Sequence, residues 1–173
     1  MYIIMKNKQN KKNKSKNQFS HLTKFIGIDP GKSGGITLIS DEGIESIKCP
    51  KEPVDMAMFF QYFIGNTAPH NVGILIERVW ARPTNGSRHA FAYGFNYGLW
   101  FGIVAMRDIE LHATLPNNWI KYFNCPKGME YNERKKWLKE KAKKLYPNIK
   151  RVTLAMADSI LIAHYAKEEF FNK

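Results

Sequence analysis

The sequence has little cysteine and no recognisable export signal. Its 173 residues include two cysteines, Cys49 and Cys125, and each of them precedes a proline. Neither a disulfide framework nor a cysteine metal site has this spacing, so we expect free thiols in a reducing compartment. No secretory signal peptide is apparent at the N-terminus. We therefore expect a cytoplasmic protein that is not secreted.

Long hydrophobic runs are also absent. The best candidate for a membrane span, residues 90–106, is short and contains Asn96 and three glycines. A spanning helix needs about 20 apolar residues, so we expect no membrane association. No internal repeat or linker is visible, and this length favours one domain with a substantial core.

Acidic residues are scarce. The chain has 27 Lys and Arg against 15 Asp and Glu, which gives a net charge of +12. Such an excess favours a polyanionic partner, most simply a nucleic acid. Residues 1–23 contain no acid and are rich in Lys and Asn. We expect them to form a disordered basic tail that can add salt-sensitive phosphate contacts, with residues 24–173 forming the domain.

The order of apolar runs and turns predicts an α/β domain. Five short runs predict strands at residues 24–29, 34–40, 43–48, 72–77 and 109–114. Tight turns join the first three, which should pair antiparallel in a mixed five-stranded sheet. Helical periodicity predicts flanking helices at residues 53–65, 88–107, 131–145 and 154–170, and a short helix opening near residues 115–119.

Two of the predicted helices carry distinctive stripes. In the second, Gly94, Gly98 and Gly102 recur every four residues, although each costs about 1 kcal/mol of helix propensity. We expect close packing there against the sheet or a neighbouring helix, with a dimer interface as the alternative. In the first, the apolar stripe predicts four core residues: Met56, Phe59, Phe60 and Phe63.

Three isolated acids interrupt apolar elements. Asp29 and Glu77 end apolar strands, and Asp158 lies inside an apolar helix. A buried charge without a partner is costly, and carboxylate oxygens are the ligands that Mg²⁺ and Mn²⁺ prefer. Asp29 on its own is equally compatible with capping its own turn. Together the three predict a divalent cation site, and the glycines beside Asp29 should leave room for a bulky group such as phosphate.

These motifs are similar to those of a known family. The segments Gly27–Gly31, Gly34–Gly35, Ile76–Glu77 and Ala157–Ala163 resemble the RuvC family of Holliday junction resolvases, especially its compact phage- and virus-type members. The resemblance implies a ribonuclease H-like fold and a homodimeric endonuclease that cuts four-way DNA junctions in a bacterial or phage-infected cell. It also implies two Mg²⁺ ions, replaceable by Mn²⁺, and no small-molecule cofactor.

The resemblance also implies roles for individual residues. Asp29, Glu77 and Asp158 would be the catalytic carboxylates and metal ligands, with Asp29 bridging the ions. Trp80 would stack on bases at the junction, although core packing is an alternative for this side chain. The helix at residues 131–145 carries seven cations against two acids. The DNA contacts expected besides Trp80 are Lys32, Arg82, Arg88, Lys135, Lys136 and Lys139.

One departure from the family pattern leaves alternatives open. The fourth ligand, an acid or His about one turn before the last Asp, is replaced by Leu154 and Ala155. Thr153 is a poor substitute, and we interpret His164 as a surface residue. A catalytically weak or inactive junction-binding module is therefore an alternative, as is a related nuclease acting on RNA or hybrids. ATP hydrolysis is disfavoured, because the chain has no room for a second domain.

Overall fold

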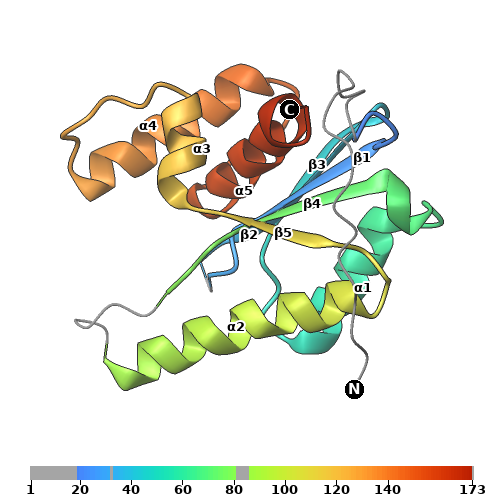
Figure 1. The fold of residues 1–173 in the computed structure, drawn as a ribbon. Helices are drawn as coiled ribbons and strands as arrows, with labels where there is room; N and C mark the ends of the chain where they lie inside the picture. Colours follow the sequence, from blue (N-terminus) through green and yellow to red (C-terminus); the bar gives the residue numbers. More distant parts are fainter. Residues whose placement is uncertain (1–18, 32, 81–85, 173) are drawn as a thin grey trace, which may run out of the picture.

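Five strands form one mixed sheet (Figure 1). The computed structural model describes residues 19–31, 33–80 and 86–172. The sheet order is β3-β2-β1-β4-β5, with β1, β2 and β3 antiparallel and β4 parallel to both β1 and β5. The predicted α/β class and mixed sheet are confirmed. The strands are β1 (Lys24–Ile28), β2 (Gly35–Ser40), β3 (Gly43–Lys48), β4 (Val72–Glu77) and β5 (Leu111–Thr114).

Helices cover both faces of the sheet (Figure 1). Helices α1 (Pro53–Ile64) and α2 (Ser87–Ala105) pack on one face, where isoleucines of β1, β2 and β4 form the first core. The second core, on the opposite face, involves α3 (Pro116–Tyr122), α4 (Tyr131–Leu145) and α5 (Leu154–Tyr165). A 3-10 turn (Pro69–Asn71) precedes β4, and a π-helical turn (Ala166–Phe170) follows α5. Within the described part of the chain, no helix combines the length and apolarity needed to cross a membrane.

Glycines in the sheet allow α5 to approach β1 and β2 closely. A Cβ atom at Gly27 would lie 2.2 Å from the backbone N of Ala163. A Cβ atom at Gly35 would lie 2.8 Å from both the Ala155 carbonyl oxygen and Ser159 Oγ. The sequence suggested that the glycines after Asp29 leave room for a phosphate. At Gly35 the space is occupied by α5 instead.

Two expectations about packing are wrong. Phe59 is 41% exposed, whereas the other members of its predicted core stripe, Met56, Phe60 and Phe63, are buried. The glycines of α2 do not pack against the sheet or a helix, because a Cβ atom at Gly94, Gly98 or Gly102 would meet no described atom within 4 Å. Helix α2 contacts the core through Trp100 and Val104. The final helix ends where the sequence predicts, because α5 continues past Tyr165 as the π-helical turn Ala166–Phe170.

The segment before β1 packs against the domain. Residues 1–18 of the predicted tail lie outside the described part of the chain. Phe19 and Leu22 pack against the second core, and the Thr23 amide donates to the Asn71 carbonyl oxygen at 2.9 Å. Both cysteines are free, as predicted, with Cys49 buried and Cys125 partly buried.

Candidate metal-binding site

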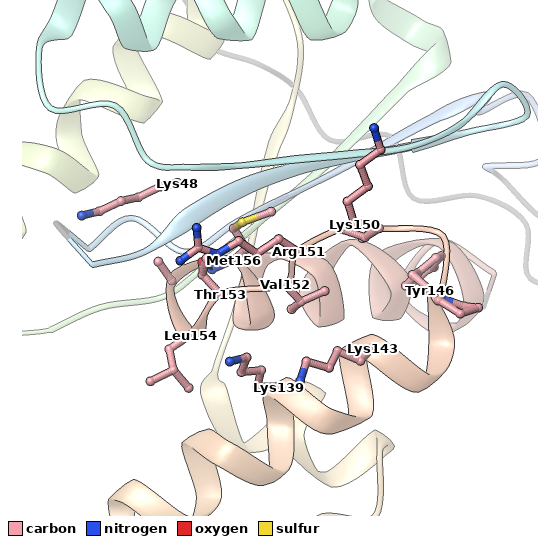
Figure 2. Close-up of a pocket in the computed structure, with 13 residues that line it drawn as sticks. Lys48, Lys139, Lys143, Tyr146, Lys150, Arg151, Val152, Thr153, Leu154 and Met156 are labelled. Carbon is pink, nitrogen blue, oxygen red and sulfur yellow. Dashed lines mark hydrogen bonds between the residues drawn. The ribbon is translucent and has the colours of Figure 1, made fainter.

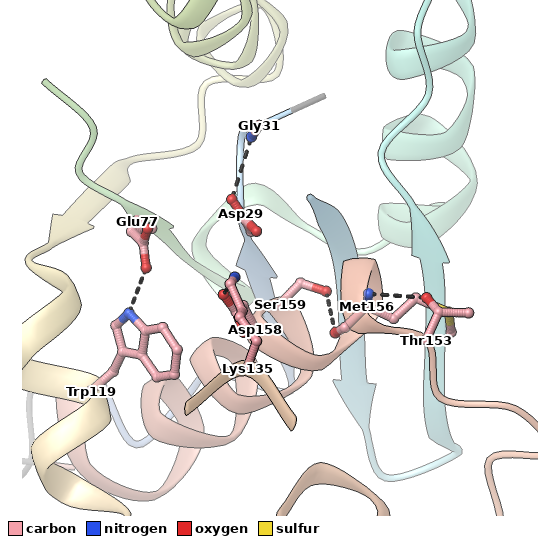
Figure 3. Close-up of polar contacts among 9 residues, drawn as sticks. All are labelled: Asp29, Gly31, Glu77, Trp119, Lys135, Thr153, Met156, Asp158 and Ser159. Atoms are coloured by element: carbon pink, nitrogen blue, oxygen red, sulfur yellow. Dashed lines mark hydrogen bonds and ion pairs between the residues drawn. The ribbon is translucent and has the colours of Figure 1, made fainter. Parts of the chain in front are cut away.

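Three different elements bring acidic side chains to one edge of the sheet (Figure 3). Asp29 directly follows β1, and Glu77 is the last residue of β4. These strands are parallel neighbours with Ile28 opposite Ile76, so the two acids follow at matching positions. Helix α5 packs across β1 and β2 and supplies Asp158 from its second turn. The sheet and α5 therefore place the predicted carboxylates around a common space.

The turn after β1 holds Asp29 in place. Its amide donates to the Gly35 carbonyl oxygen at 2.9 Å, and its Oδ1 accepts a longer hydrogen bond from the Gly31 amide at 3.3 Å. A Cβ atom at Gly34 would lie 2.1 Å from the Asp29 carbonyl oxygen, so this close turn requires glycine. Asp29 therefore caps its own turn, which was one of the two alternatives that the sequence left open for it. The weak cap is compatible with a second role for the carboxylate.

The acids interact electrostatically. Burial, followed by the nearby charge of Asp158, raises the pKa of Asp29 from 3.8 to about 6. Burial, followed by the charges of Asp29 and Asp158, raises the pKa of Glu77 from 4.5 to about 8. Burial is the larger cause of both shifts, and repulsion between the negative charges adds to it. A cation placed among them would relieve both the repulsion and the desolvation.

The positive charge of a lysine on α4 partly takes the place of such a cation. Lys135 Nζ forms an ion pair with Asp158 Oδ2. Burial opposes the charge of Lys135, but the ion pair and the charge of Asp29 outweigh it and raise the lysine pKa. We expected Lys135 to contact a DNA phosphate, and the structure places its amino group on a carboxylate. Its contact with DNA stays a prediction.

The three carboxylates have the right chemistry to bind a hard divalent cation, but they are not close enough together to bind one as they stand. Asp158 is 4% exposed, and its Oδ1 is buried without a hydrogen-bond partner. A buried carboxylate oxygen in this state is suited to ligate Mg²⁺ or Mn²⁺. Across the described residues, however, no three His, Cys, Asp or Glu side chains are close enough to form a ready metal site. Binding would require Asp29, Glu77 and Asp158 to converge and Lys135 to withdraw from Asp158.

Trp119 is a site residue that the sequence analysis missed. Its Nε1 donates to Glu77 Oε2 at 2.8 Å, and its ring is buried in the second core. The hydrogen bond fixes the orientation of the Glu77 carboxylate (Figure 3). One signal could have pointed to this contact. Helix α3, which carries Trp119, begins two residues after β5, and β5 pairs with β4, the strand that carries Glu77.

Among the described residues, those at the place of the missing fourth acid, Thr153 to Ala155, supply no carboxylate or imidazole. Leu154 is 49% exposed, and Thr153 Oγ1 accepts a hydrogen bond from the Met156 amide at 3.3 Å as the cap of α5. The interpretation of His164 as a surface residue is wrong. This histidine is half-buried, and its Nδ1 is hydrogen-bonded to the Tyr146 hydroxyl at 2.8 Å.

The residues expected to contact DNA have different surroundings. Trp80 is 53% exposed three residues after Glu77, so the alternative of core packing is wrong. Arg88 and Lys136 are exposed, on α2 and α4 respectively, and Lys139 is partly buried on α4. Lys32 and Arg82 lie outside the described residues.

The stability of the metal-free protein is expected to fall as pH rises from about 4 to 8. In this range the folded state retains protons on Asp29 and Glu77 that the unfolded chain has lost, because their folded pKa values are about 6 and about 8. This contribution is complete below the unfolded values and disappears as pH rises through the folded ones. We expect a loss of several kcal/mol, since each tenfold change in an acid constant corresponds to about 1.4 kcal/mol and both acid constants change by more than that.

Urea unfolding in EDTA at successive pH values measures this effect. Glu77→Gln should reduce the decline in the free energy of unfolding above pH 6. Mg²⁺ added to the wild-type protein at pH 8 should restore its free energy of unfolding. A stability that is constant or rises over this range would contradict the described electrostatics.

Comparisons with known proteins support the fold. No protein-family model matches the sequence, and no curated protein matches it. Among solved structures, RuvC from Thermus thermophilus in complex with a Holliday junction substrate is similar with a TM-score of 0.55 and 13% identity, over 84% of this chain and 96% of that one. A second structure of Thermus thermophilus RuvC gives a TM-score of 0.49 and 14% identity, over 83% and 95% of the two chains. The chain thus has the ribonuclease H-like fold of RuvC.

Proposed function

We propose that the protein is a structure-selective DNA endonuclease of the RuvC type, close to its compact phage and virus members, which resolves four-way junctions by metal-dependent hydrolysis. The observation that supports this most is the placement of Asp29, Glu77 and Asp158 at one sheet edge, with a buried Asp158 oxygen lacking a partner. A net charge of +12 suits a DNA substrate. The similar RuvC structure was solved with a Holliday junction substrate.

The three carboxylates would hold Mg²⁺, with Mn²⁺ as a substitute. Bound divalent ions supply charge for the phosphate and lower the pKa of an attacking water. Trp119 would keep Glu77 oriented through its 2.8 Å hydrogen bond. Lys135, once displaced from Asp158, would be free to contact a phosphate. Trp80 would stack on bases at the junction, because its exposed ring has no role in the core.

A cleavage assay with three substrates tests this proposal. A labelled four-way junction, a duplex of the same sequence and an RNA–DNA hybrid are incubated with and without Mg²⁺. We expect cutting of the junction only, and only with the metal. Preferential cutting of the hybrid would support the alternative of a nuclease acting on RNA or hybrids, and equal cutting of the duplex would exclude selectivity for branches.

We further propose a homodimer that pairs through α1 and α2. A groove of about 1250 Å³ between these helices is lined mainly by apolar side chains and includes the three α2 glycines. Phe91 and Phe95 stack on each other and remain exposed on the same helix. Soluble monomers rarely expose an apolar surface of this kind, and a second copy would cover it. Two copies would also match the two-fold symmetry of a four-way junction.

Gly98→Glu should convert the dimer to a monomer. The glycine has no described atom near its Cβ position, so glutamate fits the folded monomer but places a charge in the interface. Light scattering during gel filtration measures the mass. Tyr131→Glu, at an exposed position of α4, is the control and should remain dimeric. A monomeric wild type, or a dimeric Gly98→Glu protein, would contradict this arrangement.

A junction-binding module without nuclease activity is the second candidate. It is favoured by Leu154 and Ala155 at the place of the fourth ligand and by the pairing of Lys135 with Asp158. It predicts tight, salt-sensitive junction binding with no products in Mg²⁺ or Mn²⁺. Multiple turnover would exclude it.

A further inference from the structure

A basic cavity lies beside the N-terminus of α5, outside the carboxylate site (Figure 2). Its volume is about 1010 Å³, and no aspartate or glutamate lines it. Cationic residues line it from β3, from α4 and from the segment before α5. They are Lys48, Lys139, Lys143, Lys150 and Arg151.

Most of these cations have no acidic partner among the residues that the structure describes. Among the ion pairs of the described residues, only one involves a cavity cation, that of Lys143 with Glu140 at 2.7 Å. Five like charges around one cavity repel each other, and an anion bound there would relieve the repulsion. The first turn of α5 adds to the positive potential, because its backbone amides point toward the cavity end of the helix.

Apolar side chains complete the lining. They include Tyr146, Pro147, Ile149, Val152, Leu154 and Met156. Inorganic phosphate would gain nothing from such a surface. A nucleotide combines an anionic phosphate with a flat, largely apolar base, and single-stranded nucleic acids bind to surfaces that pair cations with apolar or aromatic groups.

The cavity and the carboxylate site lie next to each other along α5. Its lining residues Leu154 and Met156 belong to the first turn of α5, and Asp158 follows on the same helix. Four residues of helix, from Leu154 to Asp158, span about 6 Å. A DNA strand with one phosphate at the carboxylates would therefore continue within a short distance to the cavity.

We infer that this cavity binds one or two nucleotides of the DNA strand beside the phosphate to be cut. The inference rests on the proposed function and extends it, because it gives the strand a path from Asp158 across the N-terminus of α5. A strand is favoured over a free nucleotide because the cavity adjoins the carboxylate site and shares Lys139 with the basic face of α4.

The test compares two double variants with equal loss of charge. Lys48→Gln with Arg151→Gln removes two exposed cations of the cavity. Lys121→Gln with Lys167→Gln removes one cation of α3 and one of the π-helical turn after α5, neither of which lines the cavity, and is the control. Fluorescence anisotropy in EDTA measures the binding of a 12-nucleotide single strand and of a four-way junction at several salt concentrations, and ATP and pyrophosphate serve as competitors.

We expect the cavity variant to bind the single strand about tenfold more weakly, with a salt slope lower by about 1 to 2, while the control is unchanged. DNA should also protect Lys48 of the wild type from acetylation. Equal binding by both variants, or a wild type that binds no DNA, would overturn the inference. Competition by ATP as strong as that of the oligonucleotide would overturn it in favour of a mononucleotide site. A wild type that binds strands through the cavity but cuts no junction would refute the proposed function alone.

Discussion

Asp29→Asn is expected to lower the rate of junction cleavage in Mg²⁺ by about a thousandfold or more. Asparagine keeps the shape of the side chain but removes a charge that acts on both Glu77 and Lys135. Metal ions contribute several kcal/mol to such reactions, and about 4 kcal/mol corresponds to a thousandfold in rate. Single-turnover cleavage of a labelled junction measures the loss.

The variant should stay folded. Burial raises the pKa of Asp29 to about 6, so its charge destabilises the metal-free fold at neutral pH, and asparagine removes that penalty. Asp55→Asn, in the exposed first turn of α1, is the matched control and should retain full activity. Cleavage by Asp29→Asn within tenfold of the wild-type rate would show that Asp29 is not catalytic.

Gly27→Ala is expected to destabilise the protein by about 3 kcal/mol or more. The added methyl would lie 2.2 Å from the Ala163 backbone N and 2.5 Å from the Ser159 carbonyl oxygen, and neither backbone can move without shifting α5. Overpacking of a core costs about 1–3 kcal/mol, and a contact with backbone lies at the upper end of that range. Because α5 carries Asp158, cleavage should also fall.

Urea denaturation of Gly27→Ala and Gly31→Ala measures this difference. A Cβ atom at Gly31 would have its nearest neighbour, Asp29 Oδ1, at 3.6 Å, which is an ordinary contact. The Gly31 variant should therefore unfold near the wild-type midpoint. An unchanged midpoint for Gly27→Ala would contradict the close packing of α5 on β1.

Local sequence patterns predicted most of the fold. The bounds of β4 and α4 were predicted as the structure has them, because both are bordered by clear changes of pattern. Patterns that depend on tertiary packing were misread. The glycines of β1 and β2 make room for α5, which lies more than 100 residues away in the sequence, and no local signal identifies it. Phe59 follows the helical period of its neighbours, but the sheet covers only part of that face.

The candidate site was predictable only in part. Asp29 and Glu77 stand out because each ends an apolar strand, and parallel pairing of β1 with β4 brings those ends together. Lys135 is one of several lysines on a charged helix, and only the packing of α4 against α5 distinguishes it from Lys136. Trp119 resembles any core tryptophan in the sequence, and its hydrogen bond to Glu77 depends on the placement of α3 beside β4.

Crystals soaked in Mn²⁺ would show most directly whether the carboxylates of Asp29, Glu77 and Asp158 share divalent cations. We predict an anomalous difference peak within about 2.5 Å of oxygens from all three side chains, with the Lys135 amino group moved away from Asp158. A map at saturating Mn²⁺ with no peak there, and with Lys135 still paired to Asp158, would contradict the proposed metal-dependent site.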